Sequence, residues 1–231
     1  MGKNQFISWL RCLQVRQKIT WGYALSLGVA VLGTGIGILI ADYQQKLALA
    51  KVDDVLEELD IISDLQLSVL QTYNHQLQIK GLLDRSPLPQ QEYVDFKKHY
   101  NSFQQSWVKF RDSHGGTAGE EKDEHKGEVE AINSFMAKYK GTPETYIKSI
   151  DRLLSRLNPA TLNPANVSSI QADLTELERS ALMAKIHTFS DDLLVLIKHT
   201  YEEYEEAEVE LNASNSLRLR VIGGSMAISI A

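Results

Sequence analysis

Residues 19–41 read ITWGYALSLGVAVLGTGIGILIA, twenty-three positions without a charged side chain. As an α-helix this stretch is about 34 Å long, which exceeds the roughly 30 Å hydrocarbon core of a bilayer. A cleavable signal peptide has a shorter apolar core of about 7–15 residues that ends at a small-residue cleavage site. We therefore favour a permanent anchor over a signal peptide and expect residues 19–41 to form transmembrane helix 1.

The charges that flank this stretch indicate its direction. Four basic side chains and no acidic one precede it: Lys3, Arg11, Arg16 and Lys18. Because basic residues favour the cytoplasmic side, we expect residues 1–18 to be a cytoplasmic stub. Residues 42–217 are then extracytoplasmic, and the protein belongs in the plasma (inner) membrane.

The C-terminal end of the chain is apolar again. Residues 221–231 carry no charge, but they are too few to cross a bilayer. We expect residues 218–231 to be the start of a second, truncated transmembrane helix. Arg218 and Arg220 would lie on its extracytoplasmic side, which the charge rule tolerates because a long exported segment is translocated largely regardless of charge.

Charge and cysteine content restrict the function of the exported segment. All thirty acidic residues and eighteen of the twenty-four basic residues lie within residues 42–217, which gives this segment a net charge of −12. Such a surface repels phosphate backbones, so we expect no nucleic-acid partner. The only cysteine, Cys12, lies in the stub, so no disulfide is available to the exported segment and its stability must come from packing.

Proline and glycine fall in clusters between long uninterrupted stretches, as expected when the stretches are helices. Apolar residues recur every three or four positions in the first stretch (Leu49, Val52, Leu56, Leu59, Ile62, Leu65, Val69, Tyr73 and Leu77). The second stretch carries an aromatic stripe of Tyr93, Phe96, Tyr100, Phe103, Trp107 and Phe110, which we assign to a core.

The expected helices span residues 42–85, residues 92–112, residues 120–157 with a break at 141–143, and a last stretch from Pro164. Asn163 can cap the last helix, which should run unbroken into the second span. No stretch alternates with period two. The sequence therefore predicts an all-α fold, an antiparallel four-helix-bundle extracytoplasmic domain whose first and last helices are continuous with the transmembrane helices.

No catalytic constellation is apparent. The histidines lack zinc-protease spacing, no glycine-rich phosphate loop occurs, and Cys12 lies across the membrane from any histidine partner. His114 and His125 flank an acidic loop that could hold a divalent ion, although a solvated charged face is the reading we favour. We expect no catalytic residue, no cofactor and no metal.

Two glycines in the first span can support close helix packing. Gly33 and Gly37 are four residues apart, and Ala41 continues the same spacing. Small residues at this spacing let a second helix backbone approach closely. The partner is either the second span of the same chain or the same helix in a homodimer, which we expect the protein to form.

The other candidate site is charged. Six glutamates lie between residues 202 and 210, close to the second span, and their like charges repel one another along the helix. A solvated face is one reading. The sharper reading pairs Glu208 and Glu210 with Lys46 and Lys51, which lie at a comparable height if both helices start at the membrane surface.

The sequences at the two predicted membrane boundaries resemble those of a known protein family. Residues 13–19 (LQVRQKI), 22–25 (GYAL) and 216–223 (SLRLRVIG) resemble the sensor portions of membrane-bound cyanobacterial, including hybrid, sensor histidine kinases. The resemblance implies an extracytoplasmic four-helix sensor that feeds a linker and then a kinase core. That core is absent here, since His187 is followed by Thr-Phe-Ser-Asp and not by a phospho-acceptor motif.

These observations predict a sensory fragment that is not itself an enzyme. The exported bundle would bind an unknown stimulus or partner protein, and the last helix would shift against the first to transmit the signal across the membrane. The alternatives are the front end of a chemoreceptor or a cyclase, or a purely structural membrane-tethered helical bundle.

Overall fold

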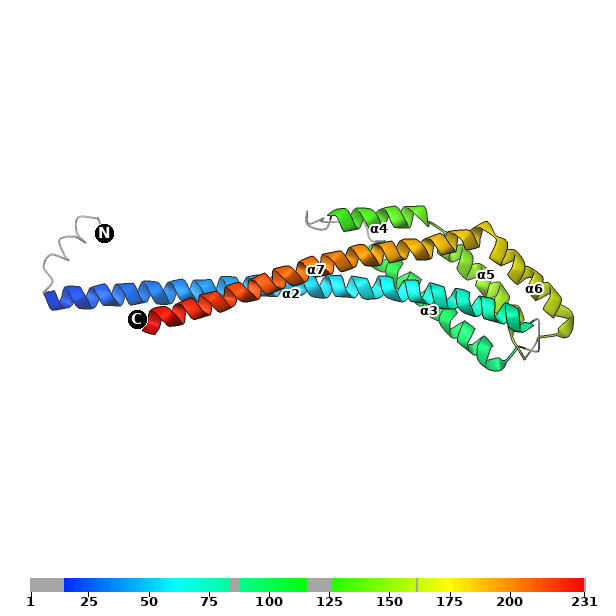
Figure 1. The fold of residues 1–231 in the computed structure, drawn as a ribbon, viewed down its shortest axis with the longest axis horizontal. Coiled ribbons are helices and arrows are strands. Elements are labelled where there is room, and N and C mark those ends of the chain that lie inside the picture. Colours follow the sequence, from blue (N-terminus) through cyan, green and yellow to red (C-terminus); the bar gives the residue numbers. More distant parts are fainter. Residues whose placement is uncertain (1–14, 84–87, 116–125, 161, 231) are drawn as a thin grey trace. The chain divides into compact units, whose positions relative to one another are not determined.

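The computed structural model describes residues 15–83, 88–115, 126–160 and 162–230, and in these ranges the chain is α-helical without any β-strand (Figure 1). The all-α prediction is confirmed. The described helices are α2 (Val15–Leu83), α3 (Gln90–His114), α4 (Lys126–Lys138), α5 (Thr142–Leu157), α6 (Pro164–Arg179) and α7 (Ala181–Ile230).

The chain divides into two compact units. Unit 1 contains Met1–Asp53 and Glu205–Ala231, and unit 2 contains Asp54–Tyr204. Helices α2 and α7 contribute residues to both units, whereas α3, α4, α5 and α6 belong to unit 2.

Helix α2 carries the apolar stretch. In the described part of the chain it is the one helix long and apolar enough to cross a membrane, judged by length and composition. Helix α7 extends to Ile230, so residues 218–230 are helical. A membrane crossing by these residues stays a prediction.

The break between α4 and α5 is where the sequence predicts it. Gly141 has a φ of 74°, a left-handed conformation that glycine adopts without a steric penalty. Pro143 lies in the first turn of α5, where its missing N–H has no intrahelical partner to lose. The predicted helix over residues 120–157 is therefore two helices in its described part.

Helix α6 begins as predicted, but the last helix is not continuous. The Asn163 side chain accepts a hydrogen bond from the backbone N–H of Ala165 at 3.0 Å and caps α6, which opens with Pro164. The expected unbroken run is wrong because Ser180 adopts an extended backbone (φ −71°, ψ 153°) and ends α6. Its hydroxyl accepts from the backbone N–H of Met183 at 3.2 Å, so that Ser180 caps α7.

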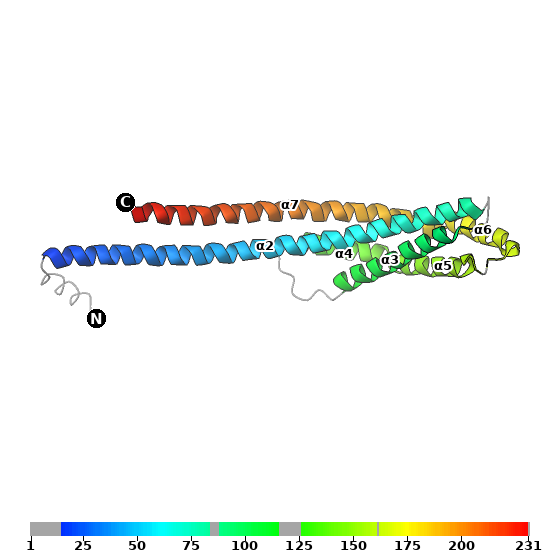
Figure 2. The ribbon, with the colours of Figure 1, turned by 90° about the horizontal axis from the view of Figure 1, so that it is seen from below.

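The core of unit 2 is rich in aromatic side chains. The five residues of the predicted stripe that are buried are Phe96, Tyr100, Phe103, Trp107 and Phe110. Their rings meet others from α4, α5 and α7, as in the tilted pair of Phe103 and Tyr146 at 5.9 Å and the edge contact of Trp107 and Phe189 at 6.0 Å. Helix α3 packs against α5, and α5 packs against α6 (Figure 2).

The buried face of α2 differs from the predicted one at two leucines. Ile62, Leu65 and Val69 are buried as expected, but Leu49 and Leu56 remain 49% and 42% exposed. Val55, which is outside the predicted stripe, is buried at this end of the face, and the polar residues Ser68, Thr72 and Gln76 are buried further along α2. The pattern of apolar residues alone therefore misplaces the face at its N-terminal end.

Candidate functional site

The candidate site is the stretch of unit 1 in which α2 and α7 contact each other. The contacts pair Gly37 with Val221, Gln45 with Asn215, and Lys51 with Glu210. Rising residue numbers in α2 meet falling numbers in α7, so these two segments run in opposite directions. We call this set of contacts the paired segment.

A glutamine lies at the centre of the paired segment. The Gln45 amide nitrogen donates a hydrogen bond to Asn215 Oδ1 at 2.8 Å, while the Gln45 carbonyl oxygen accepts one from the Arg218 guanidinium. All three side chains are half-buried. Because both ends of one amide are used, this network depends on the alignment of α2 with α7 along their axes.

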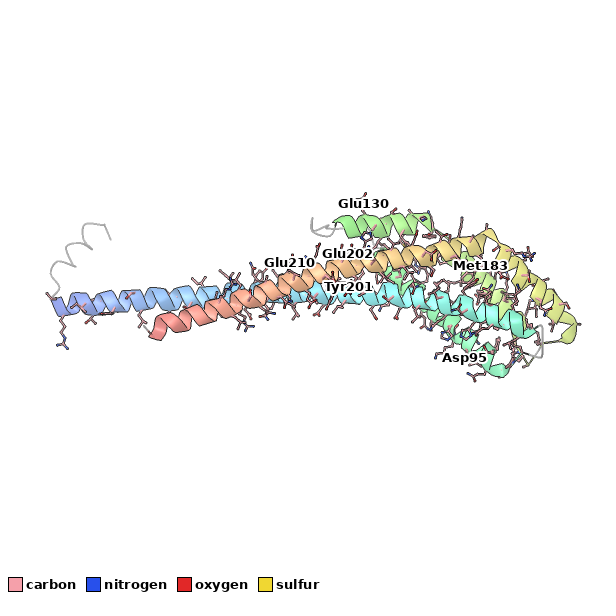
Figure 3. The ribbon with its side chains drawn as sticks, viewed as in Figure 1. Asp95, Glu130, Met183, Tyr201, Glu202 and Glu210 are labelled. Carbon is pink, nitrogen blue, oxygen red and sulfur yellow. The ribbon has the colours of Figure 1, made fainter. Side chains whose placement is uncertain are left out.

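An ion pair lies further from the apolar stretch. Lys51 Nζ and Glu210 Oε2 are 3.1 Å apart, and the side chains are 25% and 59% exposed (Figure 3 places Glu210 on α7). A pair this exposed contributes about 0–1 kcal/mol to the free energy of unfolding. It can bias the alignment of the helices, but it adds little to the stability of the fold.

The other two charges that the sequence predicts at this site lie elsewhere. Lys46 Nζ lies 3.0 Å from Asp42 Oδ2 on its own helix, so the predicted pairing of Lys46 with α7 is wrong. The physical reason is the i, i+4 spacing, which brings two side chains of one helix together. A hydrogen bond from Lys46 and its charge lower the pKa of Asp42. Glu208 is exposed, and no ion pair of Glu208 occurs among the described residues.

The two glycines of the predicted packing stripe differ in surroundings. A Cβ on Gly37 would lie 3.1 Å from Val221 Cγ1, which is tighter than ordinary carbon contacts. Within the described chain nothing lies within 4 Å of the corresponding position on Gly33. Gly37 therefore faces α7, and Ala41, only 3% exposed, continues that face.

Sequence reasoning missed Gln45, Asn215 and Arg218. A signal for Gln45 was present, because it follows Gly37 and Ala41 at the same step of four residues. No comparable pattern marks Asn215, since its neighbours on α7 are mostly small or polar residues.

One buried polar pair in unit 2 joins α5 to α2. The Tyr146 hydroxyl donates to Gln76 Oε1 at 3.0 Å, and both side chains are buried. Burial raises the pKa of Tyr146 well above its ordinary value, so the phenol stays neutral at physiological pH. This arrangement anchors α5 against α2 and has no nucleophile or base that could start a reaction.

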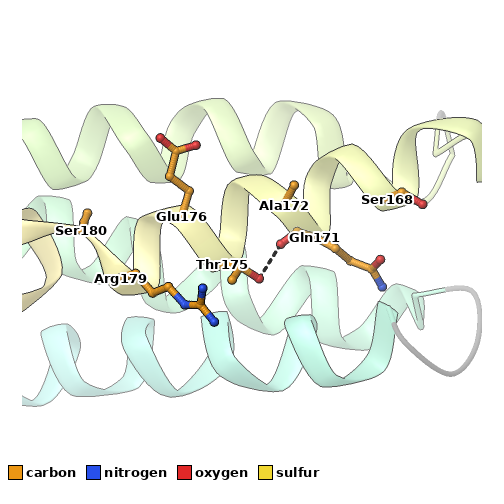
Figure 4. A pocket seen from close by; sticks show the side chains of 7 residues that line it. All are labelled: Ser168, Gln171, Ala172, Thr175, Glu176, Arg179 and Ser180. Carbon is orange, nitrogen blue, oxygen red and sulfur yellow. Dashed lines mark hydrogen bonds between the residues drawn. The ribbon is translucent and has the colours of Figure 1, made fainter.

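The groove along α6 gathers no set of reactive groups from the described residues. A groove of about 770 Å³ runs along α6 and is lined by Ser168, Gln171, Ala172, Thr175, Glu176, Arg179 and Ser180. The Thr175 hydroxyl donates to the backbone carbonyl of Gln171 at 2.8 Å, while Glu176 and Arg179 extend in different directions (Figure 4). We assign this groove to the solvated surface of α6.

Metal ligation receives no support from the part of the chain that the structure describes, where no group of three or more potential ligands converges. His114 bonds instead to Glu58 Oε1 at 3.2 Å and to the Phe110 carbonyl at 2.8 Å. His125 and Cys12 lie outside the described residues.

No protein-family profile, curated protein or solved structure matches this chain in comparisons of its sequence and fold.

Proposed function

We propose that this chain is the sensing and transmembrane signalling part of a two-component sensor histidine kinase. The observation that carries the proposal is the paired segment, in which α2 and α7 contact each other from Gly37, near the end of the apolar stretch, to Lys51. A polar network there is sensitive to small axial shifts. In this role the chain binds and transmits and does not catalyse.

In the proposed topology, residues 19–41 cross the plasma membrane with the N-terminus in the cytoplasm. Residues 42–217 are extracytoplasmic, and residues 218–231 begin the second span. The charge asymmetry around the first span and the apolar C-terminal end support this arrangement.

We further propose that the exported helices form an antiparallel four-helix bundle. In this bundle α2 and α3 are two of the four helices, α4 and α5 together form the third, and α6 and α7 together form the fourth. The protein acts as a homodimer and receives its stimulus, from a ligand or a partner protein, at the bundle. Helix shifts of about 1–2 Å then carry the signal along α2 and α7 to the membrane.

Cysteine labelling tests the topology in intact cells. A membrane-impermeant maleimide should leave native Cys12 unlabelled, because it is cytoplasmic in this proposal. The exposed Asn101→Cys change in a Cys12→Ser background should be labelled before lysis. Labelling of Cys12 in intact cells, or protection of the residue at 101, would overturn the topology.

A chimera tests signalling. Residues 1–231 are joined to a kinase core through linkers that lengthen by one residue at a time. Autophosphorylation should vary with the helical period of about 3.6 residues, since the output depends on the orientation of α7. Constant output across the series would contradict the proposal and favour a structural tether. The coding sequence after residue 231 separates a kinase from a chemoreceptor or a cyclase.

A further inference from the structure

Two histidines from different helices stack within unit 2. The rings of His75 on α2 and His99 on α3 have centroids 4.7 Å apart and an interplanar angle of 13°. Glu92 lies on α3 seven residues before His99, so both project from the same side of that helix. Glu92 Oε2 is 3.7 Å from His75 Nδ1.

The two atoms that face each other across this gap both lack a hydrogen-bond partner among the described residues. His75 Nδ1 and Glu92 Oε2 are shielded from solvent there and make no hydrogen bond. Their side chains are only 19% and 33% exposed. Because an unsatisfied buried polar atom costs free energy, native structures usually provide such an atom with a partner.

One bound proton can turn this contact into a charge-assisted pair. When Nδ1 carries the proton of an imidazolium, it can donate a charge-assisted hydrogen bond to the Glu92 carboxylate, and such bonds are short and strong. Closing the distance from 3.7 Å to hydrogen-bond length draws α2 and α3 together. Both orphaned atoms are satisfied by this single event.

The surroundings oppose a second proton on the stacked pair. Burial, followed by the charges of His75 and Lys98, lowers the pKa of His99, and the carboxylate of Asp95 opposes this shift only in part. Asp95 lies on α3 (Figure 3), where the Gln91 amide donates to both of its oxygens at 2.9 and 3.0 Å. Within the described chain, the titratable and charged groups shown to act on the pair are Glu92, Asp95, Lys98 and the two histidines themselves.

We infer that His75, Glu92 and His99 form a binding site for a single proton, through which a fall in extracytoplasmic pH tightens the contact between α2 and α3. This inference rests on the proposed sensory function for its biological meaning, since it assigns acidity as the stimulus. The stabilisation is present at low pH and is lost as the pH rises and the proton leaves.

Histidine NMR titration of the full chain in nanodiscs tests the site. With ¹³C-labelled histidine, His75→Gln should raise the titration midpoint of His99 by about 0.5–1 pH unit, because a neighbouring positive charge is removed. The matched control is His199→Gln, on an exposed side chain of α7, which should leave that midpoint unchanged. An unchanged midpoint in folded His75→Gln protein would overturn the inference.

Hydrogen exchange tests the consequence, and the chimera then separates the two hypotheses. Amides of α2 and α3 near the cluster should gain protection, after correction for intrinsic rates, between pH 7.5 and pH 5.5 in the wild type but not in Glu92→Gln. Equal gains in both would overturn the inference.

A chimera that responds to pH in the wild type and not in Glu92→Gln supports acidity as the stimulus, and a pH-insensitive chimera overturns that assignment. A failure of the linker series overturns only the proposed function, because the NMR and exchange results do not depend on kinase output.

Discussion

At the residue scale, the geometry of a helix explains why only half of the predicted charge pairs occur. Lys46 and Lys51 are five residues apart, so their directions differ by about 140° around α2. Glu208 and Glu210 are two residues apart and differ by about 160°. One lysine and one glutamate can therefore face the opposite helix, and the structure selects Lys51 and Glu210.

Reversal of the Lys51–Glu210 pair should change signalling more than stability. In the kinase chimera, Lys51→Glu should shift the basal activity, and adding Glu210→Lys should return it toward the starting value. The free energy of unfolding should change by only about 0–1 kcal/mol, because the pair is partly exposed. The control is Lys46→Glu, which disturbs a pair on its own helix. If the double reversal does not restore the basal activity, the Lys51–Glu210 ion pair has no role in signalling.

His114 should make the stability of the protein depend on pH. Burial lowers the pKa of His114, but hydrogen bonds to Glu58 and Phe110 and the Glu58 charge raise it by more. A raised pKa in the folded state means that the stabilisation is complete below the unfolded value of about 6.5 and is lost as the pH rises through the folded value.

Chemical denaturation at several pH values checks this sign. The wild type should lose stability between pH 6 and pH 8.5 relative to His114→Gln, in which the titrating group is absent. The exposed His199→Gln serves as a matched control and should follow the wild-type curve. A His114→Gln curve parallel to that of the wild type would show that the Glu58 contact has no net effect.

At the element scale, α2 and α7 meet through small residues at one end of the paired segment and through polar residues at the other. Gly37 and Ala41 allow a close approach, and Gln45 and Lys51 then supply direction-specific contacts. Steric fit and hydrogen bonding thus act on different turns of the same helix.

Bulk at Gly37 should separate the two helices, whereas bulk at Gly33 should not. The close Val221 contact makes Gly37→Leu disruptive, and the open space at Gly33 makes Gly33→Leu a matched control. The readout is the yield of a crosslink formed by a short bis-maleimide between Lys51→Cys and Glu210→Cys in a Cys12→Ser background. Equal yields would show that Gly37 is not a packing position. A membrane two-hybrid assay of Gly33→Leu then tests the homodimer contact.

Ser180 should contribute measurably to stability as the junction of α6 and α7. Its hydroxyl accepts from the Met183 N–H and donates to the Leu177 carbonyl at 2.6 Å. Ser180→Ala should cost about 1 kcal/mol in chemical denaturation, and Ser180→Asp should recover most of it because aspartate is also a good cap. Ser168→Ala, at an exposed position of α6, should have little effect. Equal losses in the two alanine variants would argue against capping.

The sequence predicts those elements that carry strong local signals. The aromatic stripe of α3 and the Asn163 cap are examples, because periodicity and capping chemistry act within a few residues. The break at Ser180 has neither glycine nor proline to mark it. The full buried face of α2 could not be predicted, because it includes polar residues. Their burial depends on hydrogen bonds to residues far away in the sequence, as with Gln76 and Tyr146. The same reason kept Asn215 and Arg218 out of the predicted site.

At the scale of the whole molecule, the packed core of unit 2 is large enough to stabilise its fold without disulfides. Every described helix contributes to its core, and many of the core side chains are aromatic. Burial of such side chains is the main stabilising contribution in a domain without disulfides. A segment of this size has ample residues for one such core.

Residues 42–217 expressed without the apolar ends should therefore be soluble and helical. Circular dichroism should give a helical spectrum and a cooperative thermal transition, and elemental analysis should find no bound metal. Phe103→Ala, at a fully buried position of α3, should lower the transition because the cavity costs about 3–5 kcal/mol. Substantial β-sheet, or a broad transition in the unmodified segment, would contradict the packed all-α fold.

The side-chain amide of Gln45 is hydrogen-bonded through both its nitrogen and its oxygen, and this has a further consequence for the proposed signalling. A hydrogen bond weakens steeply when its donor and acceptor move out of line, so a partial slide of α7 along α2 would break the bonds to Asn215 and Arg218 together. New partners become available only after a displacement on the order of a helical turn, about 5.4 Å. The proposed signalling shifts of about 1–2 Å are too short to supply new partners. Such a shift therefore either breaks both bonds together, which separates two discrete states, or leaves both bonds in place, as a small tilt does, and stays continuous.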